Sequence, residues 1–166
     1  MKTIPVQDSR MYSLMELYDM QTNFFHSVLD GISDDDAHSR LDTKANHIAW
    51  LAGSLVQQRF ELANDINGEK LEQRANELFK DNQGIKEGEK YPSLAQYRED
   101  WDRITPILRE ALLNADAGKL DTKIEMPGME MILFELVYFI IYREANHIGQ
   151  MALWRRLLGY EPMKYM

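Results

Sequence analysis

Two of the four histidines in the chain, His47 and His147, have surroundings in which an imidazole could do chemistry. His47 lies in the segment NHIAW (46–50) and His147 in EANHIGQ (144–150), both among residues of core type. Two histidines on facing helices of a bundle can bind one divalent metal ion, whereas a single histidine on an apolar face is more often hydrogen-bonded inside the core. The residues alone leave both interpretations open.

The neighbours of His147 one helical turn away limit what such a site could contain. Arg143 precedes His147 by four residues, Glu144 precedes it by three, and Gln150 follows it by three, so all three share its side of a helix. Among them, Glu144 is the anionic candidate for a third metal ligand. The chain has no cysteine, which excludes thiolate ligands and a thiol nucleophile.

Hydrophobic spacing predicts that long helices position these residues. The acidic run at 34–36 is predicted to be a turn and helix start, and 69–91 a long connection with one short helix. Residues 119–127 are expected to include a short extended segment. Pro106 is expected to kink or break the third long helix. The four helices are expected at 9–32, from Asp42 or Thr43 to about 65, from Pro92-Ser93 to about 115, and from about 129 to 158.

This order of elements predicts an all-α fold, an antiparallel four-helix bundle with one long crossover between the second and third helices. The fourth helix is apolar on more than one stripe, which favours packing against a partner outside its own bundle. Gly149 inside that helix predicts the close approach of another helix, because a helical glycine loses stability relative to alanine.

Length and charge narrow the class of protein. A chain of 166 residues with 45% hydrophobic residues predicts one globular domain spanning 1–166. The net charge of −8 makes nucleic acid an unsuitable partner. The most apolar run, 129–141, contains Glu130 and Glu135, so no membrane span is expected. No secretion signal is recognised, and a cytoplasmic location is expected.

Three segments resemble the DinB/YfiT-like superfamily. NHIAWLAG (46–53) is similar to the first metal-histidine helix of that family. The stretch from Leu78-Phe79 to Tyr91-Pro92-Ser93 is similar to its long connection, and 142–159 to its fourth-helix pattern of His-Glu-x-x-His-x-Gly-Gln followed by a basic pair and Leu-Gly. The resemblance implies an up-down bundle, a homodimer, and a divalent metal held by three histidines. His47 and His147 match two of these positions, and the third falls on Arg143.

Arginine cannot ligate a cation, because its guanidinium stays protonated and has no lone pair. Two functional hypotheses follow. In the first, His47 and His147 still hold zinc or nickel for a transferase or isomerase acting with a small thiol, and Tyr142 or Glu144 transfers a proton. In the second, the protein binds no metal, and Arg143, His47 and His147, with Gln150, line a pocket for a small anionic ligand, to which a histidine donates a second hydrogen bond. A structural alternative is that Arg143 forms an ion pair with an acidic side chain.

Overall fold

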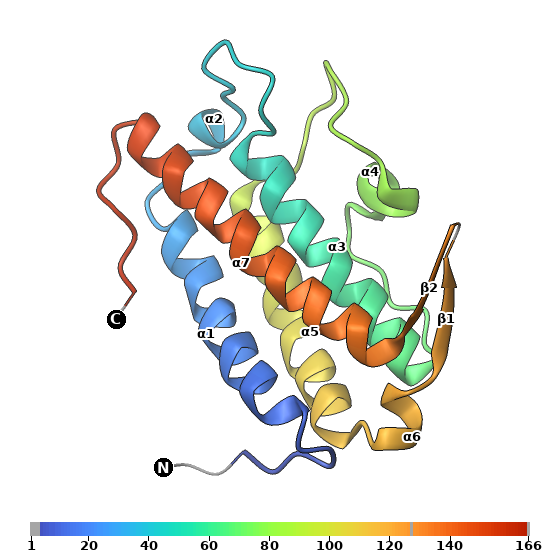
Figure 1. The fold of residues 1–166 in the computed structure, drawn as a ribbon. Helices are drawn as coiled ribbons and strands as arrows, with labels where there is room; N and C mark the ends of the chain where they lie inside the picture. The colour runs from blue at the N-terminus through green and yellow to red at the C-terminus, as the bar shows by residue number, and fades with distance from the viewer. Residues whose placement is uncertain (1–3, 127, 166) are drawn as a thin grey trace.

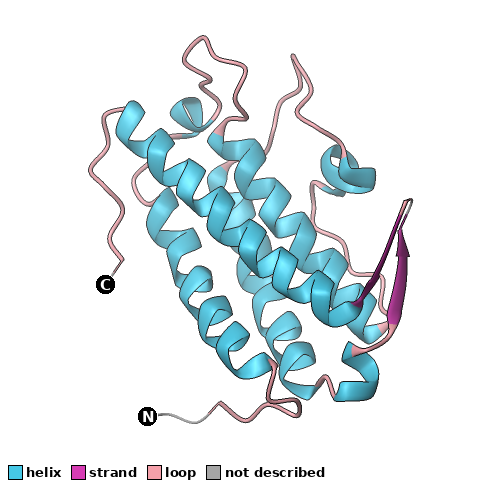
Figure 2. Cartoon of the chain, in the orientation of Figure 1, coloured by secondary structure: helices cyan, strands magenta, loops and turns pink. Residues whose placement is uncertain are grey.

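The computed structural model describes residues 4–126 and 128–165, most of which lie in helices (Figures 1 and 2). Residues 1–3 and Pro127, which closes the predicted extended segment, lie outside the described residues. The elements in chain order are α1 (Met11–Leu29), α2 (Asp34–Ala37), α3 (Ile48–Asn67), α4 (Asn76–Phe79), a 3-10 turn at Lys80–Asn82, α5 (Leu94–Asn114), α6 (Ala117–Leu120), β1 (Lys123–Met126), β2 (Met129–Ile132) and α7 (Leu133–Leu157).

Four of these elements, α1, α3, α5 and α7, form the bundle, which confirms the all-α fold and the long crossover (Figure 1). The segment between α3 and α5 returns along the bundle, so α5 runs parallel to α3. The order of directions is therefore up, down, down, up. Within this arrangement α7 is antiparallel to α3, and α1 is antiparallel to α5.

The second long helix begins later than its sequence pattern predicts. Leu41 and Asp42 have positive φ angles of 45° and 58°, and a helix N-cap needs an extended backbone instead. His47 provides that extended backbone at φ −75° and ψ 165°, and its side chain accepts a hydrogen bond from the Trp50 amide. The prediction of a start at Asp42 or Thr43 was wrong because the cap is a histidine.

Some of the other helix boundaries agree with those predicted from the sequence, and some do not. Gly68 ends α3 in the left-handed conformation with φ 70°, as its position after Asn67 predicts. Ser93 caps α5 through its hydroxyl, which accepts from the Gln96 amide, and α5 continues through Pro106 without a break. Residues Met129–Ile132 were predicted to be helical but pair with β1 as an antiparallel hairpin. The Glu135 carboxylate then accepts from the Ile132 amide, 2.9 Å away, and starts α7.

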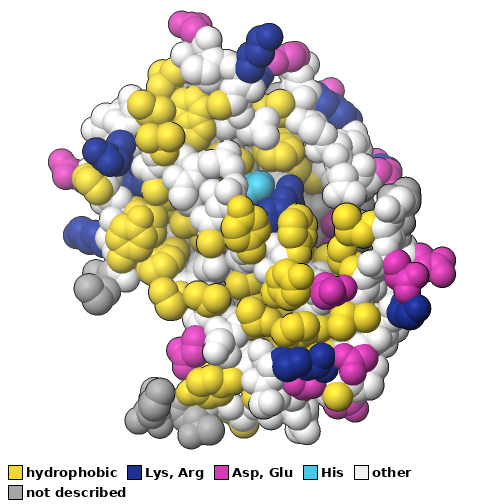
Figure 3. All heavy atoms as spheres, in the orientation of Figure 1, with side chains coloured by type: hydrophobic (Ala, Val, Ile, Leu, Met, Phe, Trp, Pro, Cys, Tyr) yellow, Lys and Arg dark blue, Asp and Glu magenta, His cyan; other side chains and the backbone are white. Residues whose placement is uncertain are grey.

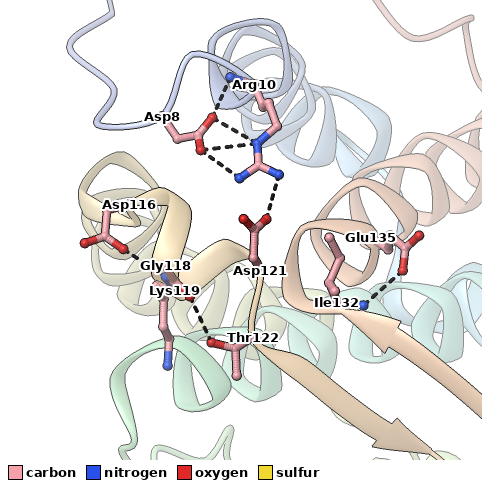
Figure 4. A network of polar contacts seen from close by, with 9 residues as sticks. All are labelled: Asp8, Arg10, Asp116, Gly118, Lys119, Asp121, Thr122, Ile132 and Glu135. Carbon is pink, nitrogen blue, oxygen red and sulfur yellow. Dashed lines mark hydrogen bonds and ion pairs between the residues drawn. The ribbon is translucent and has the colours of Figure 1, made fainter.

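Ion pairs fix both the base and the centre of the bundle. At the base, Arg10 joins Asp8 to Asp121, 2.8 Å from each, and so connects the start of α1 to the segment after α6 (Figure 4). At the centre, the Arg59 guanidinium of α3 lies over the Trp101 ring of α5, 3.5 Å from its centroid. Arg59 Nε also lies 2.6 Å from the Glu144 carboxylate of α7, and both side chains are fully buried. The bundle therefore carries a paired charge in its core.

Candidate functional site

His47 lies at the first turn of α3, where capping determines its orientation. Its Nδ1 accepts from the Trp50 amide at 3.0 Å, so Nε2 is the ring nitrogen left for a further contact. The ring centroid lies 5.2 Å from that of Tyr91 and 5.3 Å from that of His38. Only 6% of the residue is exposed. His47 is therefore held rigidly by its own helix at the edge of the core.

His147, on α7, contacts the side chain of Trp50, whose backbone amide donates to the His47 side chain. Its ring stacks near the Trp50 indole, with centroids 6.3 Å apart and planes 28° apart, and 7% of the residue is exposed. Neither ring nitrogen makes a well-formed hydrogen bond with a described residue, although the Arg143 backbone, one turn earlier, lies close enough to favour the protonated ring. Because buried polar groups are normally hydrogen-bonded, the imidazole of His147 is an unusual group that a ligand could satisfy.

Arg143 lies one turn before His147 and points across the seam between α7 and α3. Its Nη2 donates to the Ser54 hydroxyl at 3.1 Å, and the side chain forms no ion pair with a described carboxylate. It lines a cavity of about 110 Å³. Figure 3 shows a histidine and a basic side chain in a hollow between α7 and α3. The other residues that line the cavity are Trp50, Ser54, Gln57, Gln58, Glu61, Phe79, Asn82, Gln83 and Gly84.

Burial sets the charges of these groups. Desolvation and, secondarily, the nearby Arg143 charge lower the pKa of His147 to about 4. The pKa of His47 is also lowered to about 4, first by desolvation and then by His38 and Arg40. Both imidazoles are thus neutral at pH 7. Desolvation lowers the pKa of Arg143 as well, yet a guanidinium stays charged at neutral pH.

The remaining predicted site residues lie elsewhere. Glu144 is 1% exposed, and its two oxygens accept from Arg59 at 2.6 and 2.9 Å, so it points into the core. Tyr142 is 65% exposed on the outer face of α7. Gln150 is also exposed, and its amide donates to Asn146 at 2.7 Å. The structure therefore brings Arg143 and His147 together around Trp50 but does not add Glu144, Tyr142 or Gln150.

This donor set does not fit a metal centre with three protein ligands. Within residues 4–126 and 128–165, no group of three or more His, Asp or Glu side chains could hold a metal ion. The residue at the position of the family's third histidine is Arg143, which is a cation and cannot be a ligand. Glu144 is not free to bind a metal, because both of its oxygens accept hydrogen bonds from Arg59. A metal bound to His147 would have at most His47 as a second imidazole and would face the charge of Arg143.

Sequence reasoning identified Arg143 but missed the other nine residues that line the cavity, among them Trp50, Ser54 and Glu61. Their spacing contained a signal, because His47, Trp50, Ser54 and Glu61 follow one another at steps of three, four and seven along one side of α3. Desolvation raises the pKa of Glu61, while the amide of Gln57 and the charge of Arg143 lower it. His38 was also missed, and no helical periodicity relates it to α3.

Comparison with known proteins supports the family that the motifs indicate. A family model described as the DinB superfamily matches residues 17–151, which is more than half of the chain. No curated protein matches the chain. No helix in the described part of the chain is long and apolar enough to cross a membrane. On the family match and the helical fold together, the chain belongs to the DinB superfamily.

Proposed function

We propose that the protein binds a small anion, a carboxylate or a phosphoryl group, without a metal ion in the cavity beside Arg143. The observation that carries this proposal is the state of Arg143, a half-buried cation that forms no ion pair with a described carboxylate. A half-buried charge without a direct counterion is incompletely compensated: the charge of Glu61 acts on Arg143, but the two side chains do not form an ion pair. Guanidinium forms two-pronged hydrogen bonds with carboxylates and phosphates. An anionic ligand would supply the missing charge.

The polar groups around Arg143 suit an acceptor-rich ligand. The indole N–H of Trp50 is buried without a partner among the described residues, and this group can only donate. His147 is neutral, so one of its two ring nitrogens carries a proton that it can donate. Ser54 adds a hydroxyl that already touches Arg143. Donors therefore approach the cavity from both α3 and α7.

The size and wall of the cavity limit the ligand. A volume of about 110 Å³ is smaller than the usual pocket for a whole cofactor, but it has room for several waters or one acidic head group. Glu61, on the same wall, disfavours a second negative charge nearby. The ligand we expect is therefore a small monoanion, or a larger molecule that inserts only a singly charged acidic end.

A binding titration with matched arginine variants tests this function. Phosphate and acetate would be titrated at constant ionic strength, with chloride as the reference, into wild type, Arg143→Gln and Arg156→Gln. Arg156 is an exposed arginine on the same helix. At ten times the dissociation constant, a ligand adds about 1.4 kcal/mol to the free energy of unfolding. Wild type and Arg156→Gln should gain this stability, and an equal gain in Arg143→Gln would contradict the proposal.

Metal-dependent transfer to or from a small thiol is the second candidate, and the observation in its favour is that both imidazoles are neutral and able to ligate. Elemental analysis of protein purified without an affinity tag, followed by zinc and nickel titration, tests it. We expect little affinity in wild type and strong affinity in Arg143→His, which restores a third imidazole. One tightly bound metal per wild-type chain, lost in His47→Ala, would reverse the order of the two candidates.

We further propose that the protein acts as a homodimer. The support is the exposed apolar surface of α7, where large side chains such as Tyr142 and Leu157 are more than half exposed. Contiguous apolar surface of this kind marks interaction sites on soluble proteins. The ligand proposal does not depend on the dimer, since the described cavity residues all belong to one chain.

A further inference from the structure

The outer face of α7 is a continuous apolar stripe along the whole helix. Tyr138 is 47% exposed, Tyr142 65%, Leu153 57% and Leu157 58%. Figure 3 shows hydrophobic side chains gathered over this helix. Gly149 lies on the same stripe, and a Cβ added to it would meet no atom within 4 Å. The close approach that this glycine predicts is therefore not made inside the described chain.

The two ends of the stripe have complementary shapes and charges. Its N-terminal end borders an apolar pocket of about 430 Å³ with two glutamates, formed by Met129, Glu130, Met131, Glu135, Leu136, Tyr138 and Phe139. Its C-terminal end presents Leu153 and Leu157 with the exposed Arg156 between them. Arg156 forms no ion pair within the described residues. An isologous two-fold interface needs a surface that is complementary to itself. The pocket with its glutamates at one end of α7 and the protruding leucines with Arg156 at the other end meet this requirement.

We infer that α7 packs against α7 of a second copy, antiparallel, with the two-fold axis between Ala145 and Asn146. In this register the numbers of two facing residues add up to 291. Glu135 therefore faces Arg156 of the second copy, and Tyr138 faces its Leu153. Tyr142, the most exposed large apolar side chain of the helix, packs against the bare backbone at Gly149 of the second copy. Every contact occurs twice, because the interface is isologous.

The available area suits a dimer. A stable interface buries about 800 Å² on each partner, and an aromatic side chain buries on the order of 150–250 Å² when fully covered. Tyr138, Phe139 and Tyr142, each about half exposed or more, supply several hundred Å² together with Leu153, Leu157, Met129 and Met131. This inference rests on the proposed homodimer and names the surface and register through which it forms.

Sedimentation equilibrium over a range of concentrations, followed by cross-linking, tests the inference. Wild type should be dimeric, Leu153→Glu and Arg156→Glu should weaken the dimer at least tenfold, and Leu17→Glu, on the exposed side of α1, should leave it unchanged. A wild-type chain that stays monomeric overturns both the homodimer and this interface. A dimer that Leu153→Glu leaves intact overturns this interface alone.

The register has its own readout, because the chain has no cysteine of its own. Ala145→Cys lies next to the two-fold axis, so a short bismaleimide should join two copies of this variant. Glu110→Cys, exposed on α5, is the matched control and should remain uncross-linked. Dimers that form without cross-linking at residue 145 would show that the helices meet in another register, and that result overturns the assignment.

Discussion

His147 is a buried histidine whose imidazole makes no well-formed hydrogen bond with a described residue, and we expect its burial to make the stability of the protein depend on acid. Its pKa is lowered to about 4, chiefly by desolvation, whereas an unfolded chain restores a value near 6.5. Between these two values the unfolded state binds more protons than the native state. The stability that neutral His147 provides is therefore complete above pH 6.5 and is lost as the pH falls toward 4.

We predict that His147→Gln flattens this part of the pH profile. Denaturant unfolding at intervals from pH 7 to pH 4 should show wild type losing about 1–2 kcal/mol more than the variant, after discounting for solvent that reaches the site. The carboxylates titrate in both proteins, so the difference between the two curves isolates the histidine. Parallel curves would mean that His147 is not held neutral.

For individual residues, the sequence predicted which side chains lie near the site better than it predicted what they contact. Arg143 and His147 were predicted to share a face of α7, and the structure brings both to the α3 seam. The partner of Glu144 could not be predicted, because Arg59 lies 85 residues away in the sequence and no local pattern relates the two. Sequence spacing gives the face of a helix, but the tertiary fold decides which acid meets which base.

At the scale of elements, one glycine controls how closely α3 packs against its neighbours. A Cβ at Gly53 would clash with the ring of Phe79 and would lie 2.7 Å from Cε1 of Tyr97, so α4 and α5 both approach the bare backbone. Phe79 also lines the candidate cavity. The close contact at Gly53 therefore fixes one wall of the site as well as the packing of the helices.

Gly53→Ala should lower the free energy of unfolding by about 1–3 kcal/mol, because the added methyl overpacks a closed interface. Gly149→Ala is the matched control, since nothing lies within 4 Å of its added Cβ. At protein concentrations low enough to keep the chain monomeric, this control should gain about 0.5–1 kcal/mol from better helix propensity. Thermal and urea unfolding of both variants measure the contrast, and equal effects would refute the packing argument.

The boundaries of these elements show where sequence patterns stop being informative. Periodicity located all four long helices, because each buries one stripe in the core. It could not locate the start of α3, since the cap is His47 instead of a usual capping residue. Nor did it separate β2 from α7, because the hairpin residues Met129–Ile132 continue the apolar run of the helix.

At the scale of the whole molecule, one buried ion pair connects all four long helices. Arg59 of α3 binds Glu144 of α7 and donates to Thr22 of α1 and Thr105 of α5. Its guanidinium lies between the rings of Tyr18 and Trp101. A charge in a helical core is costly unless every partner is present, so this network favours one relative arrangement of the helices.

We predict that Glu144→Leu lowers the free energy of unfolding by about 3–5 kcal/mol, because it leaves the Arg59 charge buried without its counterion. The double variant Arg59→Met/Glu144→Leu should recover most of that loss, since an apolar pair of similar volume avoids the desolvation cost. Asp19→Asn is the control: it breaks the Arg109–Asp19 pair, whose side chains are 37% and 39% exposed, and should cost less than about 1 kcal/mol. Urea unfolding of the four proteins gives these differences directly. If the double variant were no more stable than Glu144→Leu, the loss would come from packing around position 144, and the fold would not depend on pairing this charge.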